Sequence, residues 1–312
     1  MSFTSDVKDE LSHVEPKCKN CTKATLTALF KSLATLTFTG SYKFRIDITT
    51  DNASIARFVI KHLHSLYDVQ TEIIMRRNVL QKATNYLIEL TNSDEVLYAL
   101  YDMGIVEIEN KKIKNFKNTI NESYINRKCC RSAYLCGVFL GGGYVNDPRG
   151  SFHLEIVLKN NIYALQIRDL IIKCNIKCNL YKRRNQHVVY IKSGQGITDF
   201  LALTGAHMCA LAIENIRVIK SIKTEEWRRA NVEIANSKRS TDAAIDQLML
   251  IKNVAKNYDM SKLSLGLKDF IALRLKYPSL SLKELGEKAN PPLSKSAVNG
   301  RLRRLKKIAS EI

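Results

Sequence analysis

The 312-residue sequence has few prolines, a deficit of acidic residues and no long apolar run. Proline occurs 5 times and glycine 13 times, whereas Lys, Asn and Ile are abundant. No segment reaches the ~20 apolar residues that span a bilayer, and the start "MSFTSDVKDELSHVEP" lacks the apolar core of a signal peptide. We therefore expect a cytoplasmic protein with no membrane span, in which the 8 cysteines stay reduced.

Basic residues are in large excess. The chain has 49 Lys and Arg against 30 Asp and Glu, a formal charge of +19. A surplus of this size favours a polyanionic partner, nucleic acid first and an anionic membrane surface second. The alternative is a basic surface that reflects a genome biased toward lysine.

The first two thirds of the sequence contain an internal repeat. "CTKATLTALF", residues 21–30, aligns with "CRSAYLCGVF", residues 130–139. Each is followed by a segment that alternates with period two ("YKFRIDITT" and "SFHLEIVLK"), a helical stretch, two strands around the triplet "RRN" and a short helix. This pattern predicts an αββαββα unit twice, over about residues 16–105 and 125–206.

The alternation of helices and strands in the two repeats predicts an α+β fold class. The whole chain is predicted to have three parts. Residues 1–206 form one domain of tandem repeats, residues 207–256 a helical spacer, and residues 257–312 an all-α module. The spacer prediction follows from its helical periodicity, its polarity and its scarcity of glycine and proline.

The C-terminal module has the pattern of a helix-turn-helix. A helix is predicted over Leu267–Lys276, with Leu267, Ile271 and Leu275 on its buried face. Ser281 and Glu284 form a capping box at the start of a second helix, and "NPP" at 290–292 ends it. A third helix begins after Ser294, and its expected buried stripe comprises Val298, Leu302, Leu305 and Ala309.

The opposite face of the third helix carries residues suited to DNA. Candidates for base contacts are Lys295, Ser296, Asn299 and Arg303, because Asn matches adenine and Lys or Arg matches guanine. Candidates for phosphate contacts are Arg301, Arg304, Lys306 and Lys307. From residue 267 to 312 there are 11 basic and 4 acidic residues. The alternative is a three-helix bundle with a solvated basic helix.

The stretch "YLCGVFLGGGYV" resembles the LAGLIDADG motif of homing endonucleases, and residues 26–34 form a weaker first copy. In that family, two motif helices pack through small residues, and an acidic residue near each helix end binds the catalytic metal. The equivalent positions here are Leu33 and Gly142, which offer no oxygen ligand for a hard cation. Asp147 follows the second copy, but the first has no counterpart. We therefore expect a saddle-shaped scaffold without nuclease activity.

A degenerate LAGLIDADG scaffold joined to a helix-turn-helix resembles the WhiA family of transcriptional regulators. The resemblance covers nearly the whole chain and depends most on "CCRSAYLCGVFLGGGYVNDPRGSFHLEI", "NVEIAN" and "LSLKELGEKANPPLSKSAVNGRLRRLKKIA". It implies a nucleoid-associated regulator that binds promoter DNA, with a last module similar to region 4 of sigma factors. It also implies a role in cell division and chromosome segregation, or in sporulation where that occurs. RNA polymerase or another transcription regulator is a further candidate partner.

Two other residue groups are candidates for function. The arginines of the repeated "RRN" (Arg76, Arg77, Arg183, Arg184) are candidates for phosphate contacts, because homing endonucleases bind DNA with the exposed sheet face. The alternative is solvated strand ends. Cys18, Cys21, Cys129 and Cys130 have the composition of a zinc site, but the repeat pairs Cys21 with Cys130, which favours small packing residues at equivalent helix starts. We therefore predict no metal and no cofactor.

The sequence leaves two rival functions open. One is an active homing-type endonuclease with displaced metal ligands. The other is a scaffold that chiefly binds another transcription regulator, with DNA binding secondary.

Overall fold

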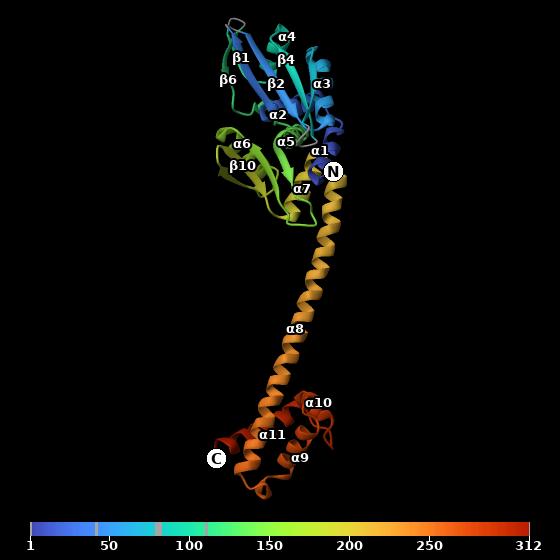
Figure 1. Ribbon diagram of the computed structural model, residues 1–312, viewed down its shortest axis with the longest axis vertical. Coiled ribbons are helices and arrows are strands. Elements are labelled where there is room, and N and C mark those ends of the chain that lie inside the picture. The colour runs from blue at the N-terminus through green and yellow to red at the C-terminus, as the bar shows by residue number, and fades with distance from the viewer. Residues whose placement is uncertain (1, 41–42, 79–82, 110–111, 312) are drawn as a thin grey trace. The chain divides into compact units, whose positions relative to one another are not determined.

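The computed structural model describes residues 2–40, 43–78, 83–109 and 112–311, and the side chains of residues 39–40, 43, 77–78 and 83 lie outside this description. The chain divides into two compact units, Met1–Ile219 and Lys220–Ile312. Figure 1 shows the order of the elements along the chain, and each unit is described separately below.

The first unit contains the predicted αββαββα arrangement twice. The first copy comprises α2 (Lys19–Leu33), β1 (Ala34–Gly40), β2 (Lys43–Thr50), α3 (Ala53–Tyr67), β3 (Glu72–Asn78), β4 (Ala83–Thr91) and α4 (Asp94–Asp102). The second comprises α5 (Lys128–Gly142), β7 (Gly143–Val145), β8 (Leu154–Leu158), α6 (Asn161–Lys173), β9 (Asn179–Arg183), β10 (Gln186–Ile191) and α7 (Gly194–Thr204). The predicted α+β class is confirmed.

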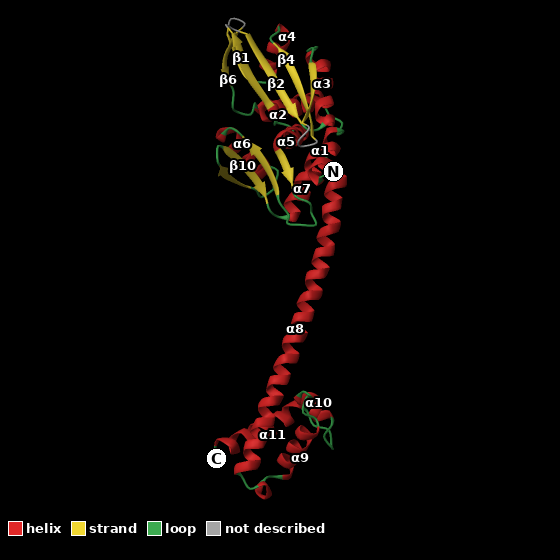
Figure 2. Cartoon of the chain, in the orientation of Figure 1, coloured by secondary structure: helices red, strands yellow, loops and turns green. Residues whose placement is uncertain are grey.

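The two copies build sheets with the same topology. The strand orders are β1-β2-β4-β3 and β7-β8-β10-β9, and the paired strands within each sheet are antiparallel (Figure 2). Because side chains alternate along a strand, Phe44, Ile46 and Ile48 of β2 all face the core. Leu154, Ile156 and Leu158 do the same in β8, as their period predicts.

Some elements of the first unit have no counterpart in the sequence prediction: α1 (Phe3–Ser12), the hairpin of β5 (Val106–Glu109) and β6 (Lys112–Phe116), and the short 3-10 helix η1 (Glu122–Tyr124). Helix α1 buries Val7 and Leu11 completely. The Thr4 hydroxyl donates to the carbonyl of Val145 at 2.8 Å, and the Glu10 carboxylate accepts the backbone N–H groups of Met208 and Cys209. The N-terminal segment is therefore part of the core of this unit.

Helices α2 and α5 pack against each other through small residues, and they lie side by side between the two sheets in Figure 1. The Thr25 hydroxyl donates to the carbonyl of Ala133 at 2.9 Å, which ties the two backbones directly. A Cβ on Gly137 would lie 2.2 Å from the Thr25 carbonyl oxygen, and one on Gly141 would lie 2.4 Å from the Cβ of Ser32. Only glycine permits this separation of the helices.

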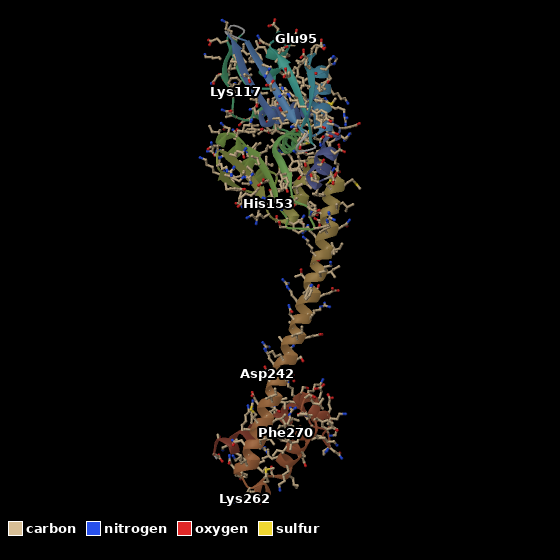
Figure 3. The ribbon with its side chains drawn as sticks, viewed as in Figure 1. Glu95, Lys117, His153, Asp242, Lys262 and Phe270 are labelled. Carbon is tan, nitrogen blue, oxygen red and sulfur yellow. The ribbon has the colours of Figure 1, made fainter. Side chains whose placement is uncertain are left out.

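The region after the second repeat is one helix, α8 (His207–Asn257). The second unit continues with the short 3-10 helix η2 (Met260–Lys262), then α9 (Leu265–Lys276), α10 (Leu282–Glu287) and α11 (Lys295–Ser310). Its core joins Phe270, labelled in Figure 3, to apolar residues of α8, η2–α9 and α11: Ile251, Val254, Leu263, Leu267, Ile271, Val298, Leu302 and Leu305. The end of α8, which the sequence predicts as part of the spacer, thus packs into the core of the helix-turn-helix.

The prediction for α9 was wrong at one position. Leu275 is exposed, and the neighbouring Arg274 is fully buried in its place. The Arg274 guanidinium donates to Gln247 Oε1 of α8 at 3.0 Å and to the carbonyls of Pro278 and Leu280 in the following turn. A buried guanidinium is tolerated because these acceptors satisfy it. It fixes the turn between α9 and α10 to α8.

We predict that Gly137→Ala destabilises the first unit by at least about 2 kcal/mol, because the new methyl group overpacks the contact between α2 and α5. The measurement is the midpoint of urea-induced unfolding of that unit, with circular dichroism as the signal. Gly150→Ala is the matched control, since a Cβ there would have the Asp147 carbonyl oxygen at 3.4 Å as its nearest neighbour among the described residues. Equal stability of the two variants would contradict the account of this interface.

Candidate nucleic-acid interface

Helix α11 is amphipathic and strongly basic. It starts where the Ser294 hydroxyl accepts the N–H of Ala297 at 3.2 Å, the predicted N-cap. Val298, Leu302 and Leu305 are buried, and the predicted fourth member of the stripe, Ala309, is half-buried and packs against the same core. The helix contains six basic residues and no acidic one.

The four candidates for base contacts lie in the N-terminal half of α11, on its solvent side. Lys295, Ser296 and Arg303 are exposed, and Asn299 is half-buried. Ser296, Asn299 and Arg303 are spaced i, i+3 and i+7, which places them on one face of the helix. This face is therefore short enough to contact a few successive base pairs.

The candidates for phosphate contacts surround this face. Arg304, Lys306 and Lys307 are exposed, and Arg301 is half-buried beside Gly266 of α9. In the part of the chain that the structure describes, none of the six α11 cations lies within salt-bridge distance of a carboxylate. No described acidic side chain therefore neutralises their charges.

The turn before α11 is closely packed. The predicted capping box between Ser281 and Glu284 is present. The N–H of Leu293 donates to the carbonyl of Gly286 at 2.8 Å, and a Cβ on Gly286 would lie 2.2 Å from the Leu293 carbonyl oxygen. Together with Arg274, this turn fixes the entry of α11 relative to α9 and α10.

The exposed face of the first sheet is of mixed charge. Arg45, Asp47, Arg76 and Asn85 line a shallow depression on it, and the Arg45 guanidinium pairs with Asp47 at 2.9 Å. Arg76 is exposed and is therefore placed as the phosphate hypothesis requires. Arg77 is in β3, but its side chain lies outside the described residues.

The second sheet places its two arginines differently. Arg183 ends β9 and its guanidinium lies 3.3 Å from Glu155, whereas Arg184 stands in the following turn with a positive φ of 56°. The ring of Tyr181 packs edge-on against that of Tyr190 on the same face, with 5.3 Å between the ring centroids. The repeated "RRN" triplets are therefore not equivalent, because only the first lies wholly within a strand.

The degenerate motif positions have no carboxylate and, in one case, no space for one. Leu33 ends α2 and packs against the core. Gly142 ends α5, and a Cβ there would lie 2.5 Å from the Val157 carbonyl oxygen. Asp147 pairs with the Arg149 guanidinium at 2.6 Å. Hard-cation ligation at the motif would thus require both new side chains and a displaced strand.

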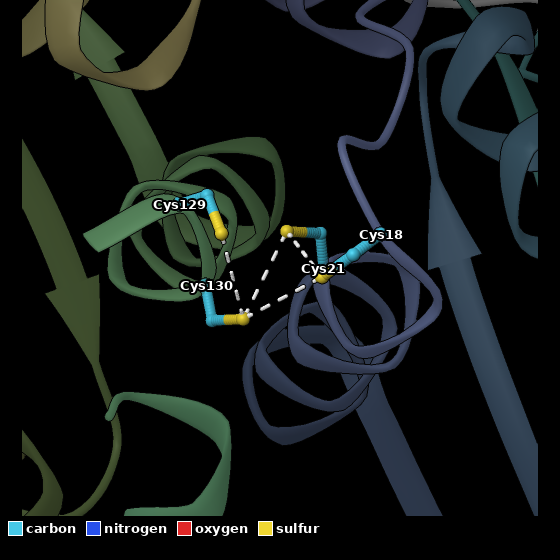
Figure 4. A group of neighbouring side chains, drawn as sticks. All are labelled: Cys18, Cys21, Cys129 and Cys130. Atoms are coloured by element: carbon cyan, nitrogen blue, oxygen red, sulfur yellow. Dashed lines mark hydrogen bonds between the residues drawn. The ribbon is translucent and has the colours of Figure 1, made fainter. Parts of the chain in front are cut away.

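The four cysteines are brought together, as Figure 4 shows. The Sγ atoms of Cys18, Cys21, Cys129 and Cys130 all lie within 4.8 Å of one another, and no other group of three or more possible metal ligands occurs among the described residues. Cys18 and Cys129 are half-buried, which departs from the expectation of small buried packing residues. The spacing alone did not reveal that the two helix starts meet.

No helix within the described ranges is sufficiently long and apolar to cross a membrane.

The chain matches family models and relatives over most of its length. Residues 19–106 match the WhiA N-terminal LAGLIDADG-like domain, residues 131–223 the WhiA LAGLIDADG-like domain, and residues 227–309 the WhiA C-terminal HTH domain. The chain is 39% identical to the probable cell division protein WhiA of Clostridium botulinum, covering 100% of this chain and 99% of that protein. It is 38% identical to the protein of the same name from Alkaliphilus metalliredigens, with coverage of 99% and 98%.

A solved structure shares the fold. The crystal structure of full-length DUF199/WhiA from Thermatoga maritima superposes with a TM-score of 0.58 at 23% identity, covering 100% of this chain and 99% of that one. The identity to the relatives extends across both units, from the degenerate LAGLIDADG repeats to the helix-turn-helix. The chain therefore belongs to the WhiA family.

Proposed function

We propose that the chain is a sequence-specific DNA-binding transcriptional regulator, located on the nucleoid, that acts in cell division without catalysing a reaction. The role in division is carried over from relatives named probable cell division protein. The proposal extends to chromosome segregation, and to sporulation where the host sporulates. In this proposal, residues 257–312 recognise the DNA sequence and residues 1–206 act as a scaffold. Residues 207–256 connect these two parts.

The observation that carries the proposal is the exposed basic face of α11 within a helix-turn-helix, whose cations form no salt bridge to a described carboxylate. Val298, Leu302 and Leu305 anchor one side of the helix, which leaves the opposite side free to enter a major groove. Arginine and asparagine on that side match the hydrogen-bond pattern of base edges. Lysines and arginines around them match phosphates, which supply affinity without sequence information.

Gly300 provides separate support for close approach of a partner to α11. It lies on the exposed side, because Ser296, Gly300, Arg303 and Lys307 follow at i, i+4, i+7 and i+11. A Cβ at Gly300 would meet no atom of the described residues within 4 Å, so packing against them does not require glycine there. Glycine in a helix interior costs about 1 kcal/mol relative to alanine. A DNA backbone or base edge placed against the helix would explain why the cost is tolerated.

In this proposal the first unit contributes binding, with no cleavage step. Two-metal hydrolysis needs oxygen ligands between nucleophile and leaving group, and Leu33 and Gly142 supply none. Arg76 and Arg184 are available for phosphate contacts, whereas Arg183 is partly neutralised by Glu155. The same surface is the candidate contact for RNA polymerase or another transcription regulator.

We predict that Arg303→Ala and Arg304→Ala have different effects on DNA binding. A duplex selected by the full chain from a random library, and a scrambled duplex, are compared by fluorescence anisotropy. Arg303→Ala should cost about 1–3 kcal/mol on the selected duplex and much less on the scrambled one, because a base contact is lost. Arg304→Ala should weaken both about equally and reduce the salt slope by about 1.

Either arginine can be reassigned by these data. Equal loss on both duplexes would remove Arg303 from the base-reading set. A loss confined to the selected duplex would move Arg304 into it. Magnesium-dependent cleavage of either duplex would contradict the non-catalytic proposal.

We predict that Gly300→Ala stabilises the second unit and weakens DNA binding. Removing the glycine should raise the unfolding free energy by about 0.5–1 kcal/mol, because alanine restricts the unfolded chain and favours the helix. The new methyl group should hinder close approach of the duplex. Thermal unfolding and anisotropy measure the two effects, with Gly150→Ala as a control remote from α11. Undiminished binding by Gly300→Ala would show that DNA does not approach this position.

A further inference from the structure

The four-cysteine cluster joins the N-terminal ends of the two motif helices. Cys18 is the N-cap of α2 and Cys21 lies in its first turn, while Cys129 and Cys130 lie in the first turn of α5. The distances from Cys130 Sγ are 3.8 Å to Cys18, 3.9 Å to Cys21 and 3.9 Å to Cys129, and Cys18 and Cys21 are 3.3 Å apart. The helices converge here, and Figure 4 shows the sulfurs pointing into the space between them.

These distances fit a tetrahedral thiolate site. With Zn–S bonds of about 2.3 Å, the sulfurs of a regular tetrahedron lie about 3.8 Å apart. Three of the four distances given above agree with that edge, and the 3.3 Å contact needs a shift of only about half an ångström. A disulfide would require an S–S distance of about 2.05 Å, which none of these pairs has. The arrangement is that of four thiols around a common centre.

We propose that Cys18, Cys21, Cys129 and Cys130 bind one Zn²⁺ ion as a structural site. Four S–H bonds would be exchanged for four S–Zn bonds, and four protons would be released without any change of oxidation state. The four protein ligands close the coordination sphere, so no position remains for water or substrate. The site is therefore structural, with no catalytic role.

The surroundings can compensate the charge of such a centre. Zn²⁺ with four thiolates carries a net charge of −2. The positive ends of the α2 and α5 dipoles point toward the cluster, because all four cysteines lie at helix starts. Lys17 and Lys128 line the cavity that borders Cys21 and Cys129. Both effects favour the thiolate forms.

The site is distinct from the metal positions of the LAGLIDADG motif. Those positions, Leu33 and Gly142, lie at the C-terminal ends of the same helices. A helix of 15 residues is about 22 Å long, so the two ends cannot share an ion. The zinc would tie together two segments more than 100 residues apart in sequence, at the N-terminal end of the helix pair that Thr25 and Gly137 hold close near its middle.

The first test is the metal content of untagged full-length protein purified under reducing conditions without chelator. We expect about one zinc ion per chain by inductively coupled plasma mass spectrometry. Replacement with Co²⁺ should give thiolate-to-cobalt charge-transfer absorption and the intense d–d bands of a tetrahedral site. Folded wild-type protein that takes up neither metal, or that has a Cys18–Cys21 disulfide under the same conditions, would overturn the proposal.

Variants assign the metal to this cluster. Cys18→Ser combined with Cys129→Ser removes two ligands at half-buried positions and should abolish stoichiometric zinc and the cobalt spectrum. Cys174→Ser is the matched control, because Cys174 is also half-buried but lies outside the cluster. A strong chelator should lower the thermal midpoint of wild type and of Cys174→Ser, and leave the double variant unchanged. Zinc retained by the double variant would contradict the assignment.

Discussion

The close contact between α2 and α5 is the constraint on which the first unit depends. Each helix starts one copy of the repeat, and each copy places its sheet relative to its own helix. The separation of the helices therefore sets the separation of the two sheets. Gly137 permits that separation, and the Thr25 hydroxyl fixes the register by bonding to the carbonyl of Ala133. The four cysteines lie at one end of this contact, and the degenerate motif positions Leu33 and Gly142 lie at the other.

The same contact holds the LAGLIDADG-like scaffold together without carboxylates at Leu33 and Gly142. Packing selects small residues along the helices, and that selection is independent of the carboxylates at the helix ends. At Gly142 the backbone of Val157 now occupies the space that a side chain would need. DNA recognition in our proposal depends on α11, whose position is set by Arg274, the capping box and the turn at Gly286. The contacts that stabilise the first unit are therefore different from those that position α11 in the second.

Much of the fold was predictable because its signals are local. The period of the strands and the capping box at Ser281 each lie within a short segment, and the repeat at Cys21 and Cys130 is visible because two short segments resemble each other. What was missed depends on contacts between distant segments. Arg274 is buried because carbonyl groups of the next turn and Gln247 satisfy it, and a charged residue in a periodic pattern gives no sign of that. The repeat pairs Cys21 with Cys130 at equivalent helix starts, but the convergence of all four sulfurs also depends on where Cys18 and Cys129 point, which their spacing does not encode.

The most direct test of the central claim, that α11 and its supporting helices read DNA sequence, is a genome-wide crosslinking map. The intact protein is compared with a chain that ends at Ile219, the last residue of the first unit. The account predicts promoter peaks that share a sequence motif for the intact protein, and loss of those peaks in the shortened chain. Motif-containing peaks that survive without residues 220–312 would contradict it and would place recognition in the first unit or in a partner protein.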